Sequence, residues 1–160
     1  MVQTYTDDVV LAALVRQAMG LAAEAGARGD APFGALLLDP SGAVVARASN
    51  RQVSADDPTA HSEIELLRVA ARAGHRSPLD GYTLVVNAEP CSMCASAIVK
   101  TAPSTLVYGA PHEAHMDPDL AVSDVFARAR NPPRVIAGIL ATEAAAQIAS
   151  FRSRSGSPVD

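Results

Sequence analysis

The chain has 160 residues, of which 49% are hydrophobic and 19% charged, which fits one compact domain with a sizeable core and argues against disorder. Its formal net charge of −4 argues against a protein built mainly to hold a nucleic-acid backbone. The polar, acidic N-terminus lacks a signal-peptide pattern, and we expect no segment with the roughly 18 apolar residues that a membrane span needs. The two cysteines lie too close in sequence for a disulfide that closes a long loop, which favours a reducing, cytoplasmic environment.

Hydrophobic periodicity divides the chain into an opening helix, a hairpin and then alternating helices and strands. Asp7 or Asp8 can cap the first helix, and an Asp-Pro-Ser-Gly turn joins the first two strands. In chain order we predict a helix up to the glycines at 26–29, strands at 33–38 and 43–48, a helix at 60–73, a strand at 82–88, a helix from 90 or 91 to just before 103, a strand at 105–109, a helix at 121–130, a strand at 135–140 and a helix at 142–152.

Strands separated by helices indicate a largely parallel sheet with helices on both faces, and the opening hairpin makes that sheet mixed. The predicted fold class is therefore α/β, a three-layer α/β/α arrangement around a five-stranded mixed sheet. The sequence contains no internal repeat, low-complexity tract or linker. We expect a single domain over residues 1–152 and a short flexible tail over residues 153–160.

Three side chains suited to zinc lie at the predicted starts of two helices. Cys91 and Cys94 place two sulfurs on one side of a helix end, whose free N–H groups favour thiolates. His61, at another helix start, can supply a neutral imidazole and complete a Cys₂His set. Three protein ligands leave a position for water, as in catalytic zinc sites, whereas a closed structural site needs a fourth ligand. That ligand could be His112 or His115.

Glu63 favours the catalytic interpretation. It follows His61 by two positions, and we expect its carboxylate to reach a water on the metal and take a proton from it. A metal that activates water, together with a carboxylate that moves protons, is typical of a hydrolytic centre. A Cys-x-x-Cys pair alone is equally typical of a redox dithiol, but a redox protein needs neither His61 nor Glu63.

The combination of His61-Ser62-Glu63 with Pro90-Cys91-Ser92-Met93-Cys94 resembles the zinc-dependent cytidine deaminase-like superfamily, and within it most closely the guanine deaminase-like enzymes. The resemblance implies that His61, Cys91 and Cys94 bind one Zn²⁺. It also implies that Glu63 moves a proton between water and a ring nitrogen during hydrolytic deamination, which releases ammonia. Ser62 stands where relatives usually carry Ala, and we expect its side chain to face away from the chemistry.

The same resemblance suggests three substrate-binding residues. Asn50 is similar to the family's base-recognising amide, although an Asn can also simply close a turn. Phe33 could wall a flat ring or could belong to the core. Guanine deaminase-like enzymes hold a second carboxylate against the ring, and Asp124 is the best candidate for it. The alternatives for this role are Asp117 and Asp119, and any of these side chains could instead cap a helix.

Two substrate classes stay open. The bacterial tRNA adenosine deaminases share the Asp-Pro-Thr-Ala-His stretch at 57–61, but they carry a basic, glycine-containing loop where this chain reads Ala110–Asp117. The acidic charge and the small number of aromatic residues favour a small heterocycle over nucleic acid. We therefore expect deamination of a free nucleobase or related azine, guanine-like first, with cytosine, isocytosine and triazine rings as further possibilities.

Two alternatives are kept beside this expectation. One is a tRNA-specific adenosine deaminase, and the other is a non-catalytic structural zinc domain, for which mutation of Glu63 has no effect. We also expect a homodimer, as in relatives, without a membrane or nucleic-acid partner.

Overall fold

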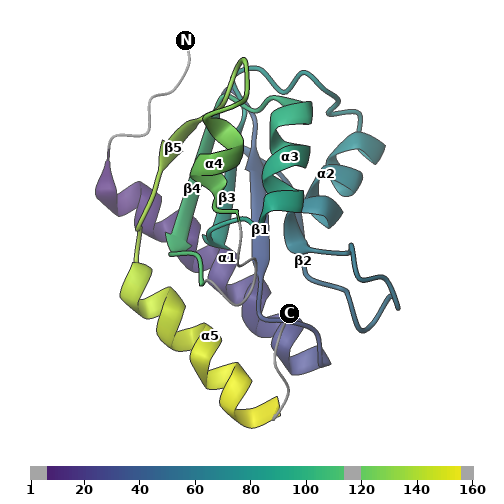
Figure 1. The fold of residues 1–160 in the computed structure, drawn as a ribbon, viewed down its shortest axis with the longest axis vertical. Helices are drawn as coiled ribbons and strands as arrows, with labels where there is room; N and C mark the ends of the chain where they lie inside the picture. Colours follow the sequence, from purple (N-terminus) through teal and green to yellow (C-terminus); the bar gives the residue numbers. More distant parts are fainter. Residues whose placement is uncertain (1–6, 114–119, 156–160) are drawn as a thin grey trace.

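In the computed structural model, which describes residues 7–113 and 120–155, one five-stranded sheet lies between two layers of helices (Figure 1). The elements are α1 (Asp8–Arg28), β1 (Gly34–Leu38), β2 (Val44–Ser49), α2 (Ser62–Arg72), β3 (Thr83–Ala88), α3 (Ser92–Thr101), β4 (Thr105–Ala110), α4 (Val122–Phe126), β5 (Arg134–Ile136) and α5 (Ala141–Ser155).

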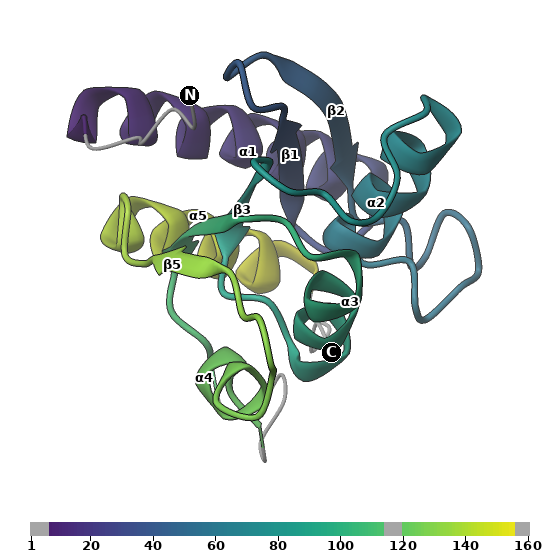
Figure 2. The same ribbon diagram turned by 90° about the horizontal axis from the view of Figure 1, so that it is seen from above.

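The strands follow the order β2-β1-β3-β4-β5 across the sheet. β1 pairs antiparallel with both β2 and β3, whereas β3, β4 and β5 are parallel. α1 and α5 pack on one face, and α2 and α3 pack on the other (Figure 2). The predicted three-layer α/β class and the mixed five-stranded sheet are thus confirmed.

The core lies on both faces of the central strands. Every residue of β1 and of β3 is buried, as expected for strands covered on both sides. Side chains alternate between the layers, so Leu36 packs with Val15 of α1 while its neighbour Leu37 packs with Leu66 of α2 and Ile98 of α3. This packing fixes the starts of α2 and α3 relative to the ends of β2 and β3.

The first helix differs from one expectation. By length and composition, the 21 residues of α1 are apolar enough to cross a membrane, so the expectation that no segment reaches this length was wrong. In this fold Leu11, Leu14 and Val15 of α1 are buried against the sheet. The apolar character of α1 is therefore explained by its place in the core.

Three elements end three or more residues away from their predicted ends. α4 ends at Phe126 instead of continuing to Arg130, because the amides of Arg128 and Ala129 bond three residues back and form tight turns. β5 ends at Ile136, since Gly138 and Leu140 take positive φ angles that turn the chain away from the strand. α5 continues to Ser155, so residues 153–155 of the predicted tail are helical. The rest of that tail lies outside the described residues.

Candidate active site

The potential metal ligands meet where two helices begin. His61 and Cys91 are the residues immediately before α2 and α3, and both have extended backbone angles. Cys94 lies in the first turn of α3 and is fully buried. The Nδ1 atom of His61 lies 3.5 Å from the Cys91 sulfur and 3.6 Å from the Cys94 sulfur. All three potential ligand atoms lie within 4.8 Å of one another.

These separations fit a zinc ion. Zinc bonds of about 2.0 Å to nitrogen and 2.3 Å to sulfur, at a tetrahedral angle, place the two ligand atoms about 3.5 Å apart. Thiolate and imidazole are also the donors that zinc prefers. His61, Cys91 and Cys94 are therefore positioned to bind zinc, as the sequence predicted.

The number of ligands bears on whether the site is open. Within residues 7–113 and 120–155, the cluster of His, Cys, Asp and Glu side chains that could hold a metal has these three members and does not include His112. His115, the other proposed fourth ligand, lies outside the described residues. Three protein ligands leave one tetrahedral position for water or substrate, which is the arrangement of catalytic zinc.

The charge of the cluster depends on the contacts between its members. A hydrogen bond from Cys94, supported by one from His61, lowers the pKa of Cys91 to about 4. The same bond to Cys91, together with burial, raises the pKa of Cys94. Burial alone would lower the pKa of His61, but its interaction with Cys91 raises it. Without a metal the two sulfurs share one negative charge, and a divalent cation can replace the remaining proton.

Glu63 lies beside this cluster and is almost fully buried. Burial raises the pKa of its carboxyl group, and the Cys91 thiolate adds to that effect. A carboxylate with a raised pKa in a cavity is suited to accepting and returning a proton.

Ser62 does not face away from Glu63, so our expectation for this side chain was wrong. Its hydroxyl donates a hydrogen bond of 2.8 Å to Oε2 of Glu63, and both residues are buried. The two side chains can meet because they occupy adjacent positions at the start of α2, where the backbone has just left its extended conformation. Ser62 therefore belongs to the surroundings of the proton-carrying carboxylate.

A small cavity of about 30 Å³ opens beside these groups, which is room for one or two water molecules. Five residues predicted from the sequence line it, and so do residues that the prediction did not include. The predicted ones are Phe33, Asn50, His61, Glu63 and Cys91, and the additional polar ones are Gln52, Ser62, Asn87 and Glu89.

Asn50 closes a turn at the cavity wall, and its role as the base-recognising amide stays a prediction. It is buried and lines the cavity. Its Oδ1 accepts a hydrogen bond from the Gln52 amide at 3.0 Å, and its Nδ2 donates one to Oε1 of Gln52 at 2.7 Å. The turn thus holds the Asn50 amide at the cavity wall. Gln52 is a second side-chain amide at this wall, and its position two residues after Asn50 could have suggested that role from the sequence.

Two further residues of the wall come from β3 and the segment after it. Asn87 accepts from the Gly34 amide at 2.9 Å and donates to the Pro32 carbonyl at 3.0 Å, which fixes the chain on either side of Phe33. Glu89 accepts from the amides of His112, at 2.8 Å, and Val122, at 3.3 Å. These bonds hold the two ends of the segment between β4 and α4 near the cavity. The roles of Asn87 and Glu89 depend on contacts with segments distant in sequence, so the sequence alone did not reveal them.

Asp124 is not among the residues that line the cavity, and its role as a substrate ligand stays a prediction. Its side chain is exposed and accepts a hydrogen bond of 2.9 Å from the Ala121 amide at the start of α4. This is the helix-capping role that competed with substrate binding. The alternatives Asp117 and Asp119 lie outside the described residues.

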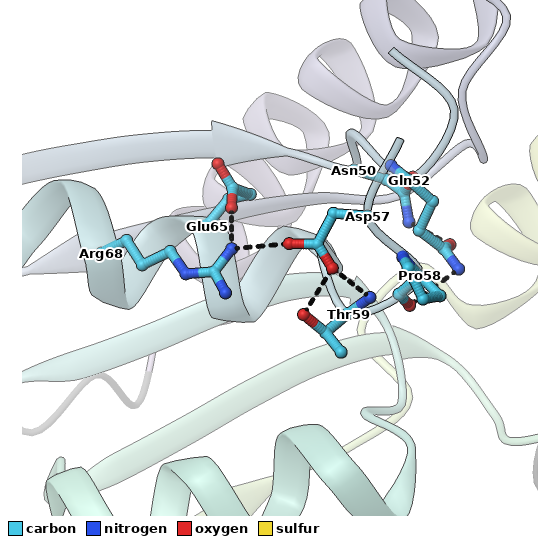
Figure 3. Close-up of polar contacts among 7 residues, drawn as sticks. All are labelled: Asn50, Gln52, Asp57, Pro58, Thr59, Glu65 and Arg68. Atoms are coloured by element: carbon cyan, nitrogen blue, oxygen red, sulfur yellow. Dashed lines mark hydrogen bonds and ion pairs between the residues drawn. The ribbon is translucent and has the colours of Figure 1, made fainter. Parts of the chain in front are cut away.

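The loop that carries Asn50 to His61 is held by polar contacts (Figure 3). The Asp57 carboxylate accepts hydrogen bonds from the Thr59 amide at 2.8 Å and from its hydroxyl at 2.7 Å. Arg68 of α2 reaches the same carboxylate at 3.5 Å and pairs with Glu65 at 2.6 Å. The Gln52 side chain donates to the Pro58 carbonyl at 3.2 Å. The loop is therefore tied to α2, and this fixes the direction from which His61 enters the site.

Comparison with known families supports this description of the site. Residues 10–110 match the family model described as the cytidine and deoxycytidylate deaminase zinc-binding region. The matched range includes all three potential ligands, Glu63 and the residues of the cavity.

Individual relatives act on different substrates. The chain is 40% identical over 97 residues to a tRNA-specific adenosine deaminase of Haemophilus influenzae, an alignment that covers 61% of this chain and 56% of that protein. It is 30% identical over 143 residues to the tRNA-specific adenosine deaminase of Bacillus subtilis, covering 86% and 85%. It is also 37% identical over 81 residues to the guanine deaminase of Bacillus subtilis, covering 51% of each chain. The alignments with the first and third relatives thus span little more than half of their lengths.

The fold has a counterpart among solved structures. A structure from a study of A-to-I editing by tRNA:A34 deaminases superposes with a TM-score of 0.75 and 34% identity, covering 84% of this chain and 98% of the other.

Proposed function

Because the chain belongs to the cytidine and deoxycytidylate deaminase family and is a zinc-dependent hydrolytic deaminase, we propose that its substrate is an adenosine in tRNA. The observation that carries this proposal is the similarity to tRNA-specific adenosine deaminase over 86% of this chain and 85% of the relative. The sequence alone favoured a free guanine-like base, and the similarity to tRNA-specific adenosine deaminases shifts the preference to the tRNA alternative.

The chemistry assigned to the site is hydrolysis of the C6–NH₂ group of adenine. When bound, zinc supplies a Lewis acid that activates a water molecule. Glu63 would take a proton from the attacking water and deliver it to the ring nitrogen N1 as the new C6–O bond forms. It would then take the second proton from the C6 hydroxyl and give it to the amino group, so that the C6–N bond breaks and ammonia leaves. Water and the amine are converted to a C6 carbonyl and ammonia. Asn50 is proposed to hold the edge of the ring and Phe33 to cover its face.

The test is turnover by the zinc-loaded protein on a tRNA anticodon stem-loop, free adenosine, guanine, cytosine and an aminotriazine. We expect inosine in the stem-loop RNA, with ammonia released in equal amount. Glu63→Gln should lower the rate by about 10²- to 10⁴-fold, the usual contribution of a general acid–base, with unchanged zinc content. Glu24→Gln, an exposed position on α1, serves as the matched control. An unaffected rate in Glu63→Gln contradicts the mechanism.

A free guanine-like base is the second candidate. It is favoured by the similarity to guanine deaminase over 81 residues. Guanine turnover without any reaction of the RNA would select this candidate.

We further propose a homodimer, in which residues 1–152 form the single catalytic domain, and a cytoplasmic location. The location is supported by the two cysteines, which are both free thiols and are needed as thiolates for zinc. Sedimentation equilibrium tests the dimer, and a molecular mass of one chain at micromolar concentration contradicts it.

A further inference from the structure

A second hollow lies at the free edge of the sheet. β2 is the outermost strand and pairs with β1 alone among the described strands. Together with α1 and α2 it borders a groove of about 390 Å³. The charged residues that line this groove are Arg28, Arg47, Arg51, Arg72 and Glu65, and we refer to it below as the arginine groove.

The charge of the arginine groove is mostly uncompensated. Arg28 is paired with Asp30 at 2.9 Å, and Glu65 is turned toward Arg68 at 2.6 Å (Figure 3). The other three arginines are exposed, and their side chains make no hydrogen bond or ion pair with any residue that the structure describes; they are Arg47, Arg51 and Arg72. Three neighbouring cations in an otherwise acidic protein mark a binding surface for anions.

The arginine groove adjoins the catalytic cavity through one short segment. Asn50 and Gln52 line the cavity, while Ser49 and Arg51, which alternate with them in sequence, line the groove. Arg28 connects the same segment to α1, because its Nη2 donates to the Ser49 hydroxyl at 3.1 Å and to the Asn50 carbonyl at 3.0 Å. A polymer that lies in the arginine groove therefore passes beside the cavity wall that is proposed to hold the base.

We propose that the arginine groove binds the phosphates of the RNA strand that presents its base to the cavity. This inference rests on the proposed tRNA substrate and adds the surface that would hold it. A guanidinium group can donate a pair of hydrogen bonds to two phosphate oxygens. A free nucleobase has no phosphate that these arginines could bind. A second copy of this chain is a poor occupant, because edge-to-edge pairing would bring the unpaired arginines of the two copies together.

The test compares two variants that lose the same charge. The groove variant is Arg47→Gln/Arg51→Gln/Arg72→Gln. The control variant is Arg76→Gln/Lys100→Gln/Arg128→Gln, whose side chains are also exposed and lie outside the groove. Binding of a fluorescent anticodon stem-loop RNA is measured with the zinc-loaded proteins between 50 and 200 mM salt, and adenosine or guanine turnover is measured in parallel.

We expect the groove variant to lose about tenfold or more in RNA affinity at 0.1 M salt. Its plot of log affinity against log salt should be shallower by about two, since each lost phosphate contact contributes about 0.7 on single strands. The control variant should change affinity by less than about threefold. Turnover of small substrates should be unchanged in both.

Equal losses in both variants, or unchanged affinity in the groove variant, overturn the inference while leaving the tRNA function intact if the RNA is still deaminated. RNA that binds through the groove without being deaminated overturns the function and leaves the inference standing. Absence of RNA binding by the unmodified protein overturns both. A dimer that dissociates in the groove variant alone, with unchanged RNA affinity, assigns the groove to a second copy.

Discussion

At the scale of single residues, the two cysteines differ in reactivity once the metal is removed. The hydrogen bond from Cys94 lowers the pKa of Cys91 to about 4, whereas Cys94 is fully buried and its pKa is raised. We therefore expect Cys91 to be a thiolate between about pH 5 and pH 8, where an ordinary thiol with a pKa near 8.5 is mostly protonated. We expect iodoacetamide to modify Cys91 alone in chelator-treated protein at pH 6, as read by peptide mass spectrometry.

Zinc provides the control for this prediction, since reloading the metal should protect Cys91. Below about pH 4 the modification should slow as the thiolate is protonated. A rate that rises tenfold per pH unit from pH 6 to pH 8 would indicate an ordinary thiol and contradict the prediction.

Ser62 should influence turnover through Glu63. Ser62→Ala removes the 2.8 Å hydrogen bond to Oε2 and frees the carboxylate to rotate. We expect kcat to fall about fivefold, which corresponds to roughly 1 kcal/mol, with KM and zinc content unchanged. Ser123→Ala on the exposed face of α4 is the control. A raised KM with normal kcat would show that Ser62 acts on binding instead.

At the scale of elements, the contact between α1 and β1 depends on a glycine. A Cβ atom at Gly34 would collide with the Ala18 carbonyl and would lie 2.7 Å from Cβ of Leu21 and 2.8 Å from the Ala22 amide. These atoms belong to a helix that is packed in the core, so none of them can move away without shifting the whole helix. We expect Gly34→Ala to lower the free energy of unfolding by about 3 kcal/mol or more, measured by urea denaturation.

Gly20→Ala is the matched control on α1. A Cβ atom there meets nothing within 4 Å, and alanine is the better helix former, so this variant should gain about 0.5–1 kcal/mol. Equal effects at the two glycines would mean that the helix does not lie as close to β1 as described.

At the scale of the whole molecule, one buried carboxylate contributes to the pH dependence of stability. Asp30 accepts hydrogen bonds from the amides of Val53, at 3.0 Å, and Ser54, at 2.8 Å, and from Arg28 at 2.9 Å. Burial alone would raise the pKa of Asp30, but these partners hold it below its ordinary value. Its stabilising contribution is therefore complete above about pH 4, the pKa in the unfolded chain, and is lost as the pH falls through the lower folded value.

Asp30→Asn should cost about 1–2 kcal/mol in the free energy of unfolding at pH 7. Between pH 5 and pH 3 the unfolding free energy of the variant should decline less steeply than that of the unmodified protein, as measured by urea titrations. Asp56→Asn, exposed and at a positive φ that Asn tolerates, is the control. Parallel pH curves for all three proteins would contradict the assignment.

The sequence predicts features that depend on residues close together in the chain, and it misses features that depend on residues far apart. Helices and strands depend on local periodicity, so the bounds of the seven elements from α1 to β4 lie within two residues of the predicted ones. The ligands at two helix starts are found from spacing. The cavity wall depends on which strands pair. The cap that Asp124 forms on α4 is a local contact, and the sequence already offered it as an alternative. Asn87, by contrast, acquires its role because β1 lies beside β3. Such non-local choices are not encoded in spacing.

The starts of α2 and α3 have a consequence for how the molecule holds together. Neither His61 nor Cys91 makes the side-chain bond that normally satisfies the first amides of a helix, since both side chains are turned to the metal site. The two residues are 30 positions apart in sequence, so an ion bound between them closes a long loop in the manner of a crosslink. Loss of the ion should release both first turns together and speed hydrogen exchange there, including at Glu63. We therefore expect metal occupancy and the alignment of Glu63 to be lost together.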